Sequence, residues 1–111
     1  MNTLGRVPPS PNLSVQRRRL AFGQVVRVRR KALGLSQEKL AERAGCDRQS
    51  INRVENAAYS PSLDRVFRLA DALGVSLSEL FAEFDAVDSG ADPVASASRS
   101  AVARGRSSAP G

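Results

Sequence analysis

The sequence contains no histidine and a single cysteine, Cys46, among its 111 residues. One thiol cannot form an internal disulfide, and without histidine the chain has too few ligands for a structural zinc site. We interpret Cys46 as a small residue at a junction between helices rather than a reactive thiol, because no basic activator is evident nearby. We expect neither a metal nor a cofactor.

Groups of residues that perform catalysis are also missing. The sequence has no glycine-rich phosphate loop, no Ser/His/Asp set and no carboxylate pair in an apolar setting. Four acidic residues instead form two pairs at helical spacing, as surface charges on helices do: Glu38 with Glu42, and Glu79 with Glu83. The sequence therefore argues against an enzyme.

Long apolar runs are absent as well. No segment approaches the roughly 18–20 apolar residues that span a bilayer. The first 25 residues contain no hydrophobic core of a signal peptide. We therefore expect no membrane association and a cytoplasmic protein, at the nucleoid of a bacterium.

The net charge of +6 is spread unevenly along the chain. Residues 1–35 carry eight basic groups and no acid, whereas residues 36–85 carry an excess of three acids. A basic block favours a polyanionic partner, although a solvated basic face is the alternative. The cluster Arg17, Arg18 and Arg19 either contacts DNA phosphates or a neighbouring groove, or is simply solvated at a frayed helix start.

Composition divides the chain into three parts. Residues 1–16 contain Pro8, Pro9 and Pro11 among Gly and Ser, which predicts a flexible arm. Residues 88–111 consist mainly of Ser, Ala, Gly, Arg and Pro, which predicts a disordered tail. The folded domain is predicted to cover residues 17–87.

Within that domain, apolar residues recur at helical spacing and regular start and stop signals separate five helices. Gly34, Gly45 and Gly74 are expected to end helices, and Ser76 with Glu79 predicts a capping box. No stretch alternates as a strand does, so we predict an all-α fold, a compact five-helix bundle with flexible tails. The predicted buried stripes contain Phe22, Val26, Leu33, Leu40, Ala41, Ala44, Ile51, Val54, Leu63, Val66, Phe67, Leu69, Ala70 and Leu73.

The most informative segment runs from Ser36 to Asn56, where two short helices flank a turn at residues 45–47. A small residue, Ala41, and a glycine, Gly45, stand where crossing helices and a left-handed turn need them. The other face of the second of these helices is polar, and its side chains can read base edges in a major groove or be solvated. That face consists of Arg48, Gln49, Ser50, Asn52 and Arg53.

Residues 22–81 resemble the lambda-repressor-like domain of the Xre/Cro family. The resemblance rests on LGLSQEKLAERAG (residues 33–45), SINRVEN (residues 50–56) and SPSLDRVFRLADALGVSLSEL (residues 60–80). It implies five helices, the third of them in the major groove, and usually a dimer. By position it implies base reading by the polar face of helix three, with Asn52 on the same helix. It also implies phosphate contacts from Gln37 and Asn56.

The resemblance further implies a structural ion pair between Arg30 and Glu55. One departure is that Ala57 stands where the family often has glycine. The exit from the third helix is then either longer or places Asn56 in the left-handed conformation.

The fifth predicted helix has more apolar residues than one short helix can bury. We assign Leu80, Phe81 and Phe84 to a dimer interface, with intramolecular packing as the alternative for Leu80 and for Leu77. Phe84 is the residue for which an interface or a partly exposed patch is favoured.

Two functions are compatible with these patterns. The first is a sequence-specific regulator, a repressor or dual regulator, that binds double-stranded DNA as a dimer on a two-fold operator. The second is a protein-interaction adaptor or antitoxin-like protein that uses the same fold to bind a partner protein. Only the first requires Arg48, Gln49 and Arg53 for its activity.

Overall fold

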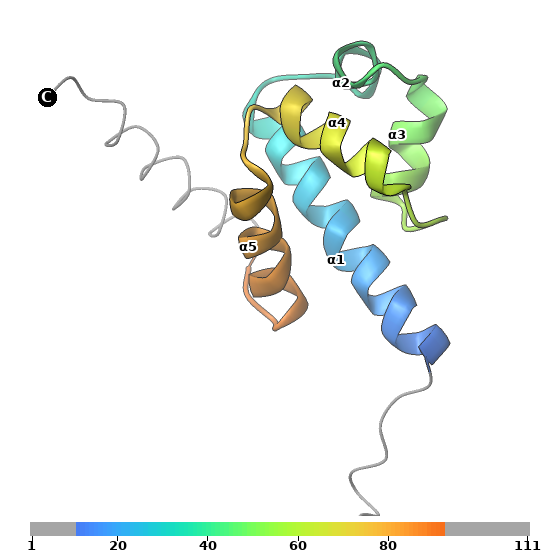
Figure 1. The fold of residues 1–111 in the computed structure, drawn as a ribbon, viewed down its shortest axis with the longest axis vertical. Helices are drawn as coiled ribbons and strands as arrows, with labels where there is room; N and C mark the ends of the chain where they lie inside the picture. The colour runs from blue at the N-terminus through green and yellow to red at the C-terminus, as the bar shows by residue number, and fades with distance from the viewer. Residues whose placement is uncertain (1–10, 93–111) are drawn as a thin grey trace, which may run out of the picture.

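A computed structural model describes residues 11–92, which form five α-helices and no strand (Figure 1). The helices are α1 (Pro11–Ala32), α2 (Gln37–Ala44), α3 (Arg48–Glu55), α4 (Leu63–Leu73) and α5 (Leu77–Asp88). The long α1 packs against α3 on one side and α5 on the other, while α2 packs against α3 and α4. The predicted all-α, five-helix class is confirmed. Within residues 11–92, no helix is both long enough and apolar enough to cross a bilayer.

Side-chain caps start each of the four later helices. The capping residues are Ser36, Asp47, Ser62 and Ser76, and each accepts a hydrogen bond from a backbone N–H in the first turn. These bonds satisfy N–H groups that have no partner inside the helix. Ser76 and Glu79 form the complete capping box that the sequence predicted.

The first helix is longer than the sequence indicated. It begins at Pro11, so residues 11–16, which were assigned to the flexible arm, are helical. Proline is well suited to a first helical turn, because its fixed φ matches the helix and its missing N–H would be unpaired there anyway. Asp88, predicted to open the tail, is the last residue of α5. The rest of the predicted arm and tail lies outside the described residues.

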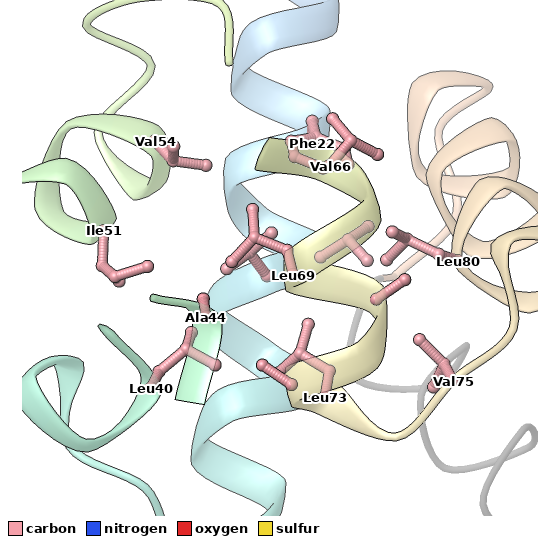
Figure 2. Packing of buried hydrophobic residues seen from close by; sticks show 14 of the residues in the cluster. Phe22, Leu40, Ala44, Ile51, Val54, Val66, Leu69, Leu73, Val75 and Leu80 are labelled. Atoms are coloured by element: carbon pink, nitrogen blue, oxygen red, sulfur yellow. The ribbon is translucent and has the colours of Figure 1, made fainter. Parts of the chain in front are cut away.

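One hydrophobic core joins all five helices. Figure 2 shows Leu40 and Ala44 of α2 and Ile51 of α3 on one side of Leu69, with Leu80 of α5 on the other. The largest fully buried side chains are Val26, Leu40, Ile51, Val54, Leu69 and Leu80. Each side chain of this size contributes about 1.5–3 kcal/mol on burial.

The prediction of burial is wrong for three residues. Leu33 is 48% exposed, Leu63 is 63% exposed and Phe67 is 41% exposed. Leu33 lies beyond the end of α1 at Ala32, so the helical stripe does not reach it. Leu63 and Phe67 lie at the edge of the α4 stripe, whose centre alone faces the core.

A buried ion pair fastens α5 to α1. Arg29 Nε donates to Glu83 Oε1 at 3.0 Å, Arg29 Nη2 contacts Glu83 Oε2, and both residues are buried. The expectation that Glu83 is a surface charge is therefore wrong. The spacing of acids along α5 could not reveal a partner 54 positions earlier in the chain.

Candidate nucleic-acid interface

The α2–α3 unit has the geometry of a helix-turn-helix. Gly45 adopts φ 71° and ψ 37°, and its N–H bonds to the carbonyls of Ala41 and Glu42 as α2 ends. That left-handed conformation costs glycine nothing, because it has no Cβ. Two residues later, Asp47 Oδ1 accepts the Ser50 N–H at 2.8 Å and starts α3. The backbone N–H and the side chain of Ser50 hold the pKa of Asp47 below its ordinary value, so a negative charge meets the positive end of α3.

The two faces of α3 differ sharply. Ile51 and Val54 are buried in the core. The opposite face carries the predicted base-reading residues, of which Arg48, Gln49 and Arg53 are exposed and Ser50 and Asn52 are partly exposed. The side chains of Arg48 and Gln49 make no hydrogen bond or ion pair with any residue in the range 11–92. Their donor and acceptor groups are therefore available to a ligand.

Gln37 and Asn56, the phosphate contacts that the resemblance implied, flank this face. Gln37 is the first residue of α2, and its Nε2 donates to Glu55 Oε1 at 3.1 Å. Asn56 caps the C-terminus of α3, and its Nδ2 donates to Asn52 Oδ1 at 3.1 Å. Gln37, Asn52 and Asn56 thus lie in one network, which sequence reasoning did not anticipate.

The ion pair that the resemblance implied is present. Arg30 Nε donates to Glu55 Oε2 at 2.7 Å and Arg30 Nη2 to Glu55 Oε1 at 3.0 Å. Burial alone would raise the pKa of Glu55. The hydrogen bonds from Arg30, Gln37 and Arg27, with the charge of Arg30, outweigh burial and lower that pKa. The pair fixes the C-terminal end of α3 against α1.

Gly23, a residue that sequence reasoning missed, allows α3 to approach α1 closely. A Cβ at Gly23 would lie 2.6 Å from the carbonyl oxygen of Val54 and 2.8 Å from that of Glu55. Both distances are far shorter than real Cβ contacts. A glycine inside a helix costs about 1 kcal/mol relative to alanine. A glycine in the middle of a predicted helix therefore suggests that the position is needed for close packing, and this was the signal that the sequence offered.

The left-handed residue after α3 is Ala57 rather than Asn56. The helix ends at Glu55, and Asn56 has φ −95°, so the expectation of a left-handed Asn56 is wrong. Ala57 itself is left-handed, with φ 59°, and its side chain is buried. For a residue with a Cβ this conformation costs about 1–2 kcal/mol. Ala57 therefore adopts a conformation that glycine adopts more readily.

The three arginines of the α1 cluster contact two different parts of the domain, the end of α5 and the segment after α3. Arg17 Nε lies 3.3 Å from Asp88 Oδ1 and Arg18 Nε lies 3.6 Å from Asp88 Oδ2. Both arginines are mostly exposed, so water screens these pairs. Arg19 Nε instead donates to Ser60 Oγ at 2.8 Å, beside the segment that follows α3.

The predicted dimer residues of α5 separate into core and surface. Leu80 is fully buried within the domain, so it has no surface to offer a second subunit. Phe81 is 41% exposed, and Phe84 stacks edge-on against both Phe22 and Phe81. These rings border an open groove of about 260 Å³, lined by Val15, Arg18, Arg19, Phe22, Ser60, Pro61, Val66, Phe81 and Phe84.

Comparison with known proteins gives one consistent family. The helix-turn-helix family model matches residues 26–80. An uncharacterized HTH-type transcriptional regulator of Methanothermobacter thermautotrophicus is 54% identical over 50 residues, which cover 45% of this chain and 72% of the relative. An uncharacterized transcriptional regulator in the ATPase CF(0) region of Rhodospirillum rubrum is 34% identical over 82 residues, covering 74% and 76%.

A third relative is the immunity repressor protein of Bacillus phage phi105. It is 34% identical over 64 residues, which cover 58% of this chain and 44% of the repressor. No solved structure matches the chain significantly. The matched range contains the whole α2–α3 unit, and more than two thirds of two regulators are covered. The chain therefore belongs to the lambda-repressor-like helix-turn-helix family of DNA-binding transcriptional regulators.

Proposed function

We propose that the protein is a sequence-specific regulator that reads double-stranded DNA by placing α3 in the major groove. In this proposal Arg48, Gln49, Ser50 and Arg53 face base edges, and Gln37 and Asn56 contact phosphates. Occupying an operator in this way would block transcription, and the relative named as a phage immunity repressor supports that mode of action.

The observation that carries the proposal is the contrast between the two faces of α3. One face is locked into the core by Ile51 and Val54, so the helix cannot rotate. The other presents Arg48 and Gln49, which have no partner within residues 11–92. A rigid helix with unpaired arginine and amide groups matches the bidentate recognition of guanine and adenine.

The test is selection of bound duplexes from a random pool, followed by affinity measurements on the selected motif. Arg48→Ala and Gln49→Ala should each lose about 1–3 kcal/mol of binding free energy and relax preference at one base pair. Arg68→Ala removes the same charge from an exposed position on α4 and serves as the control. Motif selection that survives both α3 substitutions would reject this site. Selection of no motif by the unsubstituted protein would favour the adaptor function instead.

We further propose that two copies associate through the groove beside α5. Phe81 is an exposed aromatic ring next to Phe84, and burying aromatic rings is a common source of subunit affinity. Phe81→Gln should then convert a dimer into a monomer in light scattering at tens of micromolar, while circular dichroism at 222 nm shows that the helices are retained. Leu33→Gln, at an exposed leucine outside the groove, is the matched control. A monomeric unsubstituted protein would contradict the proposal.

A further inference from the structure

Five side chains, from α1, α2, α3 and the residue that caps the C-terminus of α3, close a ring of hydrogen bonds beside the α3 face. Arg27 Nε and Gln37 Nε2 both donate to Glu55 Oε1, at 3.4 and 3.1 Å. Asn52 Nδ2 donates to Gln37 Oε1 at 3.4 Å, and Asn56 Nδ2 donates to Asn52 Oδ1 at 3.1 Å. Arg27 Nη2 then donates to Asn56 Oδ1 at 3.3 Å and completes the ring.

The chemistry of the ring permits only one orientation of its three amides. Glu55 is ionised, because its pKa is lowered, and a carboxylate can only accept hydrogen bonds. Gln37 must therefore turn its NH₂ group toward Glu55, which leaves its oxygen to accept from Asn52. Asn52 donates to Gln37, which leaves its own oxygen to accept from Asn56. The oxygen of Asn56 then accepts from Arg27, a residue that can only donate. The buried charge thus sets the direction of each amide in turn.

This orientation decides what the ring can offer a ligand. Each amide oxygen is engaged inside the ring, while each amide nitrogen keeps a second N–H with no acceptor among the described residues. Phosphate oxygens only accept, so they match a set of donors. Adenine needs both the oxygen and the nitrogen of one amide turned toward the base edge, whereas Asn52 directs its oxygen at Asn56 and one N–H at Gln37.

We propose that this ring is a pre-oriented phosphate-binding element in which Asn52 and Arg27 join Gln37 and Asn56, and in which Glu55 is the positioning residue. The inference rests on the proposed DNA-binding function. It reassigns Asn52, which the sequence placed among the base readers, and gives Arg27 a role that the sequence did not suggest. The ring also makes α1, α2 and α3 present their donors as one unit.

The first experiment compares binding of Asn52→Ala and Gln49→Ala across all variants of the selected motif. Asn52→Ala should weaken every duplex by the same factor, about tenfold, because it removes one hydrogen bond to a charged group. The slope of the logarithm of the binding constant against the logarithm of salt concentration should be unchanged in Asn52→Ala. In Arg27→Ala that slope should fall by about the value of one phosphate contact. Gln49→Ala should instead lose preference at one base pair. Loss of preference at a single base pair by Asn52→Ala would overturn the inference.

The second experiment tests the ring without DNA, by recording side-chain amide resonances of the ¹⁵N-labelled protein. Glu55→Gln should shift the resonances of Gln37, Asn52 and Asn56 together, while that of the exposed Asn12 on α1 stays in place. If Glu55→Gln does not fold, Asn52→Ala should still shift the resonances of Gln37 and Asn56. A shift confined to Gln37 in the first variant, or no shift in the second, would overturn the ring.

The two experiments separate failure of the inference from failure of the proposed function. Coupled resonances in a protein that binds no duplex would reject both DNA binding and the phosphate role while leaving the ring itself. A selected motif with relaxed preference in Asn52→Ala would reject the inference and keep the function.

Discussion

Replacing Gly23 with alanine tests whether the close approach of α1 and α3 determines stability. The new Cβ would have to move away from the carbonyl oxygens of Val54 and Glu55 by about 0.6–0.8 Å to reach the 3.4 Å of an ordinary contact. Overpacking of this kind costs about 1–3 kcal/mol, and backbone atoms that cannot swing aside favour the upper value. Alanine returns about 1 kcal/mol of helix propensity. The expected net loss is therefore about 2 kcal/mol.

Thermal unfolding followed by circular dichroism at 222 nm measures this loss. For a domain of this size, 2 kcal/mol corresponds to a fall in Tm of about 8–16 °C. Gln24→Ala, at the exposed neighbouring position, is the control and should change stability by no more than about 0.5 kcal/mol. A Tm for Gly23→Ala equal to or above that of the unsubstituted protein would refute the packing argument, because only the propensity term would then remain.

Three further changes test the ion pair, its ionisation and a helix cap. Arg30→Met should cost about 3 kcal/mol in thermal unfolding, because it leaves Glu55 buried without its closest positive partner; a loss below about 1 kcal/mol would contradict this. Because the pKa of Glu55 is lowered on folding, its contribution is complete above its ordinary value of 4.5 and disappears as pH falls through the lower folded value. Tm measured against pH should therefore fall more steeply below 4.5 than in Glu55→Gln, with Glu38→Gln as the exposed control. Ser76→Ala should lower the free energy of unfolding by about 1 kcal/mol, because it removes the α5 cap. Ser78→Ala, exposed inside the same helix, should not lower it. Equal losses in the two variants would show that the cap does not stabilise α5.

Much of the helical framework could be predicted from local signals. Caps such as Asp47 and Ser76, and a terminating glycine such as Gly45, bond to groups within one helical turn. Their effect can therefore be predicted from a few adjacent residues. The start of α1 was missed because Pro11 is a helix breaker inside a helix but a good residue in its first turn. A composition-based boundary does not distinguish these two uses.

The polar face of α3 could likewise be placed from the spacing of Ile51 and Val54, but its hydrogen bonding could not. The burial of Glu83 and the ring through Arg27 and Asn52 depend on which helices pack together. Helical periodicity gives the faces of each helix separately and does not say which face meets which. Periodicity therefore does not reveal these contacts, which join residues 15 to 54 positions apart. The Arg30–Glu55 pair, 25 positions apart, was expected only because of the family resemblance.

The pairing of α1 with α5 has a consequence for the order in which the chain folds. The α2, α3 and α4 contacts join neighbouring segments, whereas Arg29 must find Glu83 across a loop of 54 residues. Closing long loops is slow relative to local contacts, so we expect docking of α5 to be the last step. Until it occurs, Phe22 lacks the ring of Phe84, and the α1 surface beside it stays in water. A chain interrupted before Leu77 would therefore remain prone to aggregation however well its helix-turn-helix had formed.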